Sequence, residues 1–161
     1  MATVNPYLTF HGACEEAFKF YESAFGAKVP FWGRFGEMPP MEGMPPLADA
    51  YKNQIMHVSL PISKETTLMG SDSLPVMGEH KSGNDFSVSI NTDSREEALN
   101  LFTKLSEGGK VTMALQDTFW GAYFGMWEDQ FGVQWMVNYD NPEKVQAHGY
   151  LRISLGGPAD L

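Results

Sequence analysis

Apolar residues recur with helical spacing in two parts of the chain. In the first part, the residues at i, i+3, i+4, i+7 and i+8 are Ala17, Phe20, Tyr21, Ala24 and Phe25. In the second part, the corresponding residues are Ala98, Leu101, Phe102 and Leu105. Each set forms one apolar stripe along a helix, so the spacing predicts two amphipathic helices.

The two parts are also similar residue by residue. The segment EEAFKFYESAFGAKV begins at Glu15, and EEALNLFTKLSEGGKV begins at Glu96, an offset of 81. Two amphipathic helices can look alike by chance, but here the paired glutamates, a glycine and a Lys-Val pair match too. Only one extra residue, at Gly108-Gly109, interrupts the match. The pattern therefore favours an internal duplication.

The predicted helices have recognisable ends. Ser94 with Glu97 fits a capping box, in which each residue pairs with a free backbone N–H of the first turn. Gly26 and Gly108 stand where a helix would end in a left-handed residue.

Short alternating segments, which are typical of strands, surround each helix. The segments before the helices are PYLTF and FSVSI. Those after the first helix are KVPFWGRFG, QIMHVSLPI and TTLMGSD, and those after the second are KVTMALQDT, AYFGMWED and VQWMVNY. The order β-α-β-β-β thus occurs twice. We predict an α+β fold in which two modules, 1–80 and 81–140, form one cup-shaped, mostly antiparallel sheet.

Two segments fall outside the repeat. GEMPPMEGMPPLADA, at 36–50, holds four prolines and three methionines and cannot form a regular helix or a central strand. We expect it to be a long connection between two strands of the first module. The tail at 141–161 either docks on a partner surface or is mobile.

Composition narrows the choice of partners. At 161 residues the chain is long enough for one domain with its own core. The net charge of −9 argues against nucleic acids and anionic membranes as partners, because both require clustered Lys and Arg. The opening MATVNPYLTF does not fit a signal peptide, and a single cysteine favours a reducing cytoplasm. A small molecule or a protein is left as the partner.

The repeated segments resemble the vicinal oxygen chelate superfamily, which includes glyoxalases, bleomycin-binding proteins and extradiol dioxygenases, and within it the PhnB-like group. The stretches that carry the resemblance are NPYLTFHGACEEAFKFYESAFGAKV, FGEMP, LMGSD and DTFWGAYFGMWEDQFGVQWMVN. The resemblance implies a glyoxalase-like fold paired in a homodimer. It also implies a cup in which metal-using members hold a divalent ion through His, Glu or Gln.

The positions where the resemblance places metal ligands lack suitable donors. The first-strand position falls on Pro6, and the repeat offset carries it to Ser87. The last-strand position falls on Met136, and its counterpart in the first module on Leu68, Met69 or Gly70. A divalent ion needs at least three oxygen or nitrogen donors. We therefore predict no cofactor, with a divalent metal possible only through other ligands.

Other side chains are candidate replacements. His57 lies in QIMHVSLPI and either points into the cup or is a hydrogen-bonded histidine on the less apolar strand face. Asp72 and Asp117 follow strands, where an aspartate is usually a turn former. The remaining histidines, His11, His80 and His148, have no ligand-like spacing. We interpret Cys14, beside two glutamates, as structural.

Apolar residues could line a ligand cup. Seven aromatic residues lie between 119 and 135, and they are either the core of the sheet or the wall of a cup. Trp120 and Tyr123, at an irregular loop, are the best placed to contact a ligand. Met38, Met41 and Met44 form either an adaptable lid or ordinary surface packing.

Two functional hypotheses follow. The first is a protein that binds a small molecule in an aromatic-lined cup without a metal, with His57, Asp117, Trp120, Tyr123 and Met136 as candidate contacts. The second is a metal-dependent lyase, isomerase or dioxygenase that acts on vicinal oxygens, with His57 and an aspartate as ligands. A third, weaker hypothesis is an interaction scaffold.

Overall fold

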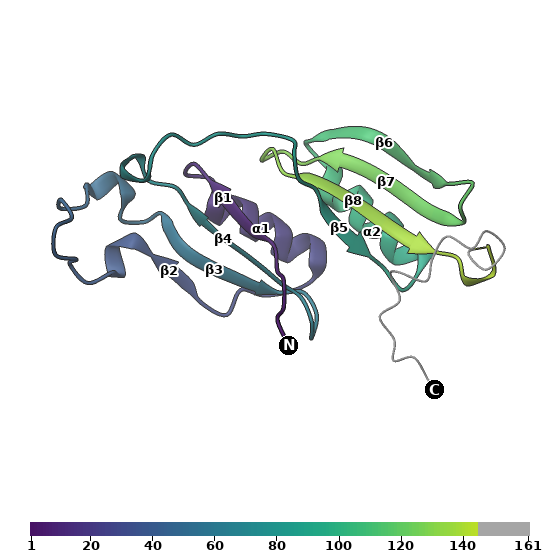
Figure 1. Cartoon of the computed structure of the whole chain (residues 1–161), viewed down its shortest axis with the longest axis horizontal. Helices are drawn as coiled ribbons and strands as arrows, with labels where there is room; N and C mark the ends of the chain where they lie inside the picture. Colours follow the sequence, from purple (N-terminus) through teal and green to yellow (C-terminus); the bar gives the residue numbers. More distant parts are fainter. Residues whose placement is uncertain (145–161) are drawn as a thin grey trace. The chain divides into compact units, whose positions relative to one another are not determined.

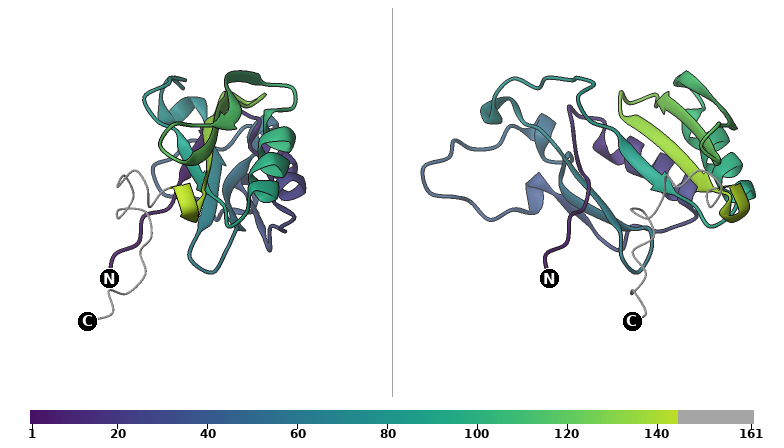
Figure 2. Two further views of the ribbon diagram at one scale, coloured as in Figure 1. Left: turned by 90° about the vertical axis from the view of Figure 1, so that its right-hand side faces the viewer. Right: turned by 45° about the vertical axis from the view of Figure 1, so that its right-hand side comes forward.

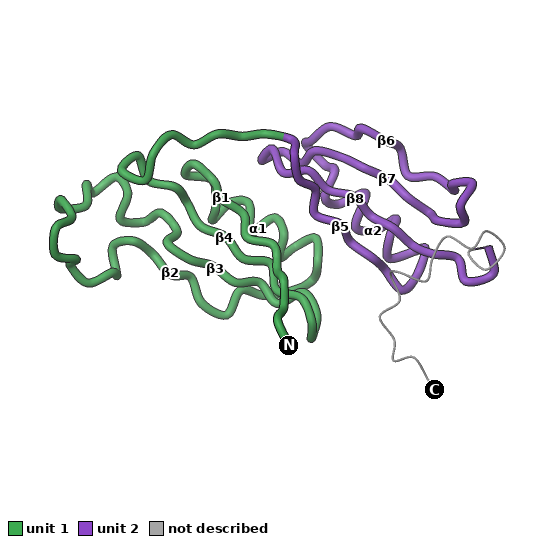
Figure 3. The backbone as a smooth tube through the Cα atoms, in the orientation of Figure 1, with its two compact units in different colours: residues 1–83 green, residues 84–161 purple. Residues whose placement is uncertain are grey.

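The computed structural model describes residues 1–144, which divide into two compact units (Figures 1 and 3). The first unit ends at Gly83 and the second begins at Asn84. Residues 145–161, and with them His148 and most of the 141–161 tail, lie outside the described part.

The first unit contains five main elements, which follow the predicted order. They are β1 (Tyr7–Phe10), α1 (Cys14–Phe25), β2 (Trp32–Arg34), β3 (Ile55–Pro61) and β4 (Thr67–Asp72). The strands form a sheet in the order β1-β4-β3-β2. β1 pairs with β4 in parallel, and the other two pairs are antiparallel. Three short 3-10 turns lie between or after these strands: η1 (Phe35–Glu37), η2 (Asp49–Tyr51) and η3 (Pro75–Met77).

The second unit repeats the arrangement. Its elements are β5 (Val88–Asn91), α2 (Arg95–Ser106), β6 (Lys110–Asp117), β7 (Ala122–Glu128) and β8 (Gln134–Asp140). The strand order is β5-β8-β7-β6, again with one parallel pair, β5 with β8. The predicted α+β fold with two β-α-β-β-β modules is confirmed. A cup shared by both modules and a dimer stay predictions.

The apolar stripe of α1 packs on the first sheet, but its centre differs from the predicted one. The buried residues are Cys14, Ala17, Phe18, Tyr21 and Ala24. Phe20 and Phe25, which the spacing assigned to the stripe, are only partly buried. Phe18 fits against the sheet because Gly70 of β4 has no side chain, and a Cβ there would lie 2.7 Å from the Phe18 ring.

The two helices begin with different caps. Ser94 Oγ accepts a hydrogen bond from the Glu97 N–H at 3.1 Å, as the capping box predicts. The Glu97 carboxylate accepts from the N–H of Asp93, one residue before the cap. The residue before α1 is Ala13, whose side chain cannot cap the helix. The carboxylate of Asp72, from β4, takes this role, as described below.

In the part of the chain that the structure describes, no helix is long and apolar enough to cross a membrane.

Candidate functional site

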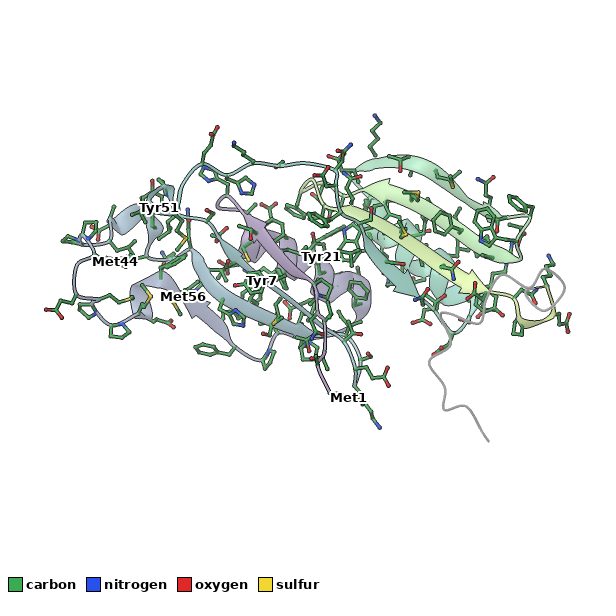
Figure 4. The ribbon with its side chains drawn as sticks, in the orientation of Figure 1. Met1, Tyr7, Tyr21, Met44, Tyr51 and Met56 are labelled. Atoms are coloured by element: carbon green, nitrogen blue, oxygen red, sulfur yellow. The ribbon has the colours of Figure 1, made fainter. Side chains whose placement is uncertain are left out.

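A cavity of about 880 Å³ lies in the first unit, beneath the Pro- and Met-rich connection between β2 and β3. Figures 1 and 2 show this connection looping out from the ends of the two strands. Most of residues 38–48 line one side of the cavity, and η3 lines another. Phe35, Tyr51 and Met56 complete the apolar wall, and Figure 4 shows Tyr51 and Met56 with Met44 in this region.

The sequence of the connection explains why it forms a cover instead of a strand. Prolines lack the N–H that a sheet needs, so the four prolines of this segment keep it out of the ladder. Backbone hydrogen bonds join its two ends. The Phe35 N–H donates to the Gln54 carbonyl at 3.1 Å, and the Gly36 N–H donates to the Lys52 carbonyl at 2.8 Å. The loop is therefore anchored at its base.

A tight turn shapes the middle of the connection. The Met44 N–H donates to the Met41 carbonyl at 3.2 Å, which closes a four-residue β-turn. Gly43 has φ +86°, the left-handed value that the third residue of a type II turn requires. Met41 and Met44 stand at the two ends of this turn, and both line the cavity.

Met56 reaches the cavity because of an irregularity in the sheet. Gly33 of β2 pairs with His57, and Arg34 pairs with Ile55, so Met56 has no partner residue on β2. An extra residue of this kind is a β-bulge, and it changes the direction of the neighbouring side chains. As a result Ile55 is buried with Val58, although strict alternation would place them on opposite faces.

The charged groups at the cavity wall are already paired. The Asp72 carboxylate, only 2% exposed, accepts the Cys14 N–H at 3.0 Å and the Ile55 N–H at 2.8 Å. Asp72 thus caps α1 and fixes the start of β3 in addition to lining the cavity. The Lys52 ammonium lies 2.6 Å from the Asp49 carboxylate and lowers the pKa of that group.

The first sheet has an open face, by which we mean the face opposite α1. Gly70 faces the helix, so strand alternation places its neighbour Met69 on the open face. Met69 pairs with Tyr7 on one side and with Ser59 on the other, so these two residues share that face. Ser71 of β4 lies on it too and lines the cavity, which therefore borders the open face.

His57 is part of a polar trio on the open face, with Tyr7 and Ser59. The Tyr7 hydroxyl lies 3.3 Å from His57 Nδ1, and Ser59 Oγ lies 3.0 Å from His57 Nε2. A neutral imidazole donates one hydrogen bond and accepts one, so one hydroxyl hydrogen of the trio is left to point outward. The trio can therefore donate a hydrogen bond to a ligand on this face. Neither Tyr7 nor Ser59 was among the candidate contacts expected from the sequence.

The second sheet also has an open face, the one opposite α2, and this face is apolar at its centre. Gly125 of β7 faces α2, since a Cβ there would lie 2.9 Å from the Phe102 ring. Its neighbour Met126 therefore lies on the open face, together with its partner Met136 of β8. Met136 also pairs with Ser89 of β5. The family position at Met136 thus does lie on the open face, but it carries a thioether.

The candidates near the β6–β7 turn separate into two groups. Trp120 packs against Phe124, with ring centroids 6.2 Å apart, at the end of the second open face. Asp117 instead forms a two-pronged ion pair with Arg95, at 2.6 and 2.9 Å, which lowers the pKa of the Asp117 carboxyl. The Arg95 guanidinium also lies 3.8 Å from the centre of the Tyr123 ring. Asp117 and Tyr123 are therefore both engaged with Arg95 within the second unit, whereas His57 belongs to the first.

The donors in the described residues do not fit the metal centre that the resemblance implies. Within residues 1–144, no three His, Cys, Asp or Glu side chains come together as a group that could hold a metal ion. Pro6 precedes β1 and alternates with Tyr7, so it does not share the open face. Ser87, just before β5, is exposed. The absence of a divalent metal stays a prediction.

The remaining candidates, Cys14, His11 and His80, contact other groups of the protein. Cys14 is fully buried at the start of α1, and burial, followed by the nearby Asp72 and Glu15 carboxylates, raises the pKa of its thiol. His11 and His80 stack on each other, with ring centroids 6.0 Å apart.

Comparisons with known proteins identify the relatives of this chain. The family model described as the Glyoxalase/Bleomycin resistance protein/Dioxygenase superfamily matches residues 3–137. Protein YjdN of Escherichia coli (strain K12) is 33% identical over 148 residues, which cover 89% of this chain and 99% of YjdN. The solved structure of protein PA1353 from Pseudomonas aeruginosa is 41% identical, with a TM-score of 0.76 over 87% of this chain and 98% of the other. The PhnB protein from Bacillus cereus is 23% identical, with a TM-score of 0.66 over 86% and 99%.

Proposed function

We propose that this chain, which belongs to the glyoxalase/bleomycin resistance protein/dioxygenase superfamily, binds a neutral, apolar small molecule without a divalent metal. The site is the cavity beneath residues 38–48. The observation that carries this proposal is the cavity itself, whose volume of about 880 Å³ is within the range of small-molecule sites.

The composition of the wall supports an apolar ligand. Prolines, methionines and the rings of Phe35 and Tyr51 make up most of it. Methionine side chains adapt to ligands of different shape, because they are unbranched and polarizable. The support thus comes from the Met-rich connection more than from the aromatic residues between 119 and 135.

The electrostatics of the wall support a neutral ligand. The cavity is lined by one cationic side chain, Lys52, and one carboxylate, Asp72. Lys52 is paired with Asp49, and both Asp72 oxygens accept backbone N–H groups. The Lys52–Asp49 pair is largely exposed and therefore weak, so the preference for a neutral ligand rests on Asp72, whose carboxylate is already engaged, and on the apolar remainder of the wall.

A fluorescent apolar probe tests the proposal. N-phenyl-1-naphthylamine, which is neutral and brightens in apolar surroundings, is titrated into the wild-type protein, Met56→Glu and Met113→Glu. Met113 is the matched control because it lies on β6 in the second unit and is 37% exposed. We expect Met56→Glu to weaken probe binding more than about tenfold, because it places an unpaired charge at the apolar wall.

Three results would contradict the proposal: no saturable binding to the wild-type protein, equal binding to all three proteins, or equal loss in both variants. Thermal unfolding of each variant shows that it is folded before it is compared. The metal-dependent enzyme remains the alternative hypothesis, and no cluster of His, Cys, Asp or Glu within residues 1–144 favours it.

A further inference from the structure

Methionines are concentrated around one cavity. Of the ten methionines in the chain, five line it. They are Met38, Met41, Met44, Met56 and Met77. Three of them are spaced three residues apart on the connection between β2 and β3, and the other two come from β3 and η3. An apolar wall needs only side-chain volume, but thioethers add sulfur atoms, which are soft ligands.

The β-turn in the connection keeps the Cα atoms of two of these methionines close to each other. In a β-turn the Cα atoms of the first and fourth residues are less than about 7 Å apart, and here these residues are Met41 and Met44. Both side chains line the cavity and are also accessible from solvent, at 55% and 42% exposure. Flexible side chains on a turn of this size can direct two sulfur atoms at one ion.

We propose that Met41 and Met44, with Met38 as a third donor, bind a soft monovalent cation, Cu⁺ or its analogue Ag⁺. Thioethers are neutral and polarizable, so they select Cu⁺ over cations such as Mg²⁺ and Ca²⁺, which prefer oxygen ligands. Glu42, between the two methionines of the turn, and the net charge of −9 both favour the approach of a cation.

This inference goes beyond the proposed function, because it requires sulfur where the small-molecule site requires only apolar surface. Replacing methionine by leucine separates the two, since leucine keeps the volume and the apolar character. A Met41→Leu/Met44→Leu double variant should therefore lose the cation, and it should lose much less affinity for N-phenyl-1-naphthylamine than Met56→Glu does.

The test uses Ag⁺ in chloride-free buffer at neutral pH, with native mass spectrometry for stoichiometry and thermal unfolding for affinity. We expect one Ag⁺ per wild-type chain. Removing even an outer-sphere partner of a metal ligand lowers metal affinity by roughly tenfold or more. The double variant removes two ligands, so its affinity for Ag⁺ should fall by far more than that. Met113→Leu, a change of a methionine that does not line the cavity, should bind Ag⁺ as the wild-type protein does.

The thiol of Cys14 is the competing soft donor, and it is buried with 0% exposure. A Cys14→Ala variant that keeps one Ag⁺ supports the thioether site. The proposal is overturned if Cys14→Ala abolishes binding, if the double variant still binds one Ag⁺ with wild-type affinity, or if Met113→Leu loses as much binding as the double variant.

Discussion

Replacing Asp72 by alanine removes the acceptor for two buried backbone N–H groups. One belongs to Cys14 at the start of α1, and the other to Ile55 at the start of β3. Both residues have 0% exposure, so their N–H groups are buried and lose their acceptor together. The change therefore tests whether one side chain of β4 connects the helix to the sheet in the first unit.

The expected magnitude follows from these contacts. A buried donor left without a partner costs about 1–3 kcal/mol, so two donors together cost about 2–6 kcal/mol. Loss of a negative charge beside the first turn of α1 adds about 0.3–1 kcal/mol. We expect Asp72→Ala to lower the free energy of unfolding by about 4 kcal/mol, a large part of the ~5–15 kcal/mol of a typical domain. Asp72→Asn keeps one acceptor oxygen and should lose about half as much.

Urea unfolding followed by far-ultraviolet circular dichroism measures the difference, provided that the slope with urea is unchanged. Asp85→Ala is the control, because Asp85 is an exposed aspartate just beyond the first unit. If Asp72→Ala and Asp85→Ala unfold within about 1 kcal/mol of each other, the reasoning about unpaired buried donors is refuted.

Two further predictions concern the same unit. Hydrogen bonds from Arg34 and then Lys19 lower the pKa of Glu15 to about 2, so the ionised carboxylate stabilises the fold above pH 4.5, and this contribution is lost as the pH falls through 2. Glu15→Gln should therefore reduce the fall in the free energy of unfolding across that range, measured by urea unfolding, by about 1 kcal/mol or less, because solvent screens the pair. Equal pH profiles of the two proteins would contradict this. Gly70→Ala would place a Cβ 2.7 Å from the Phe18 ring, so we expect thermal unfolding to show a loss of about 1–3 kcal/mol, and an unchanged melting temperature would show that the ring moves freely.

The spacing of apolar residues was sufficient to predict which elements form and in what order. Helices and half-buried strands each bury one face, and this leaves a periodic trace in the sequence. The centre of the α1 stripe was predicted less well. Phe18 is buried in place of Phe20 because Gly70, more than 50 positions later, leaves room for its ring. A contact of this kind has no local signal.

The site residues show a similar limit. His57 was singled out from its strand, but its hydrogen-bond partner Tyr7 lies 50 positions earlier. The repeat offset of 81 holds for the helices, which begin at Cys14 and Arg95. For the first strands the offset is wrong by one residue. It equates Tyr7 with Val88, but Tyr7 lies on an open face, whereas Val88 pairs with Trp135, which is buried. Face assignments therefore cannot be carried from one module to the other by counting.

The parallel pairing of β1 with β4 has a consequence for how the chain folds. Tyr7 pairs with Met69, so the first strand cannot join its sheet until nearly the whole first unit has been synthesised. β3 and β4, by contrast, are neighbours in sequence and can form a hairpin early. Contacts of long sequence separation form late and slow folding. We infer that the β3–β4 hairpin and α1 assemble first, and that β1 closes the edge of the sheet as the final step.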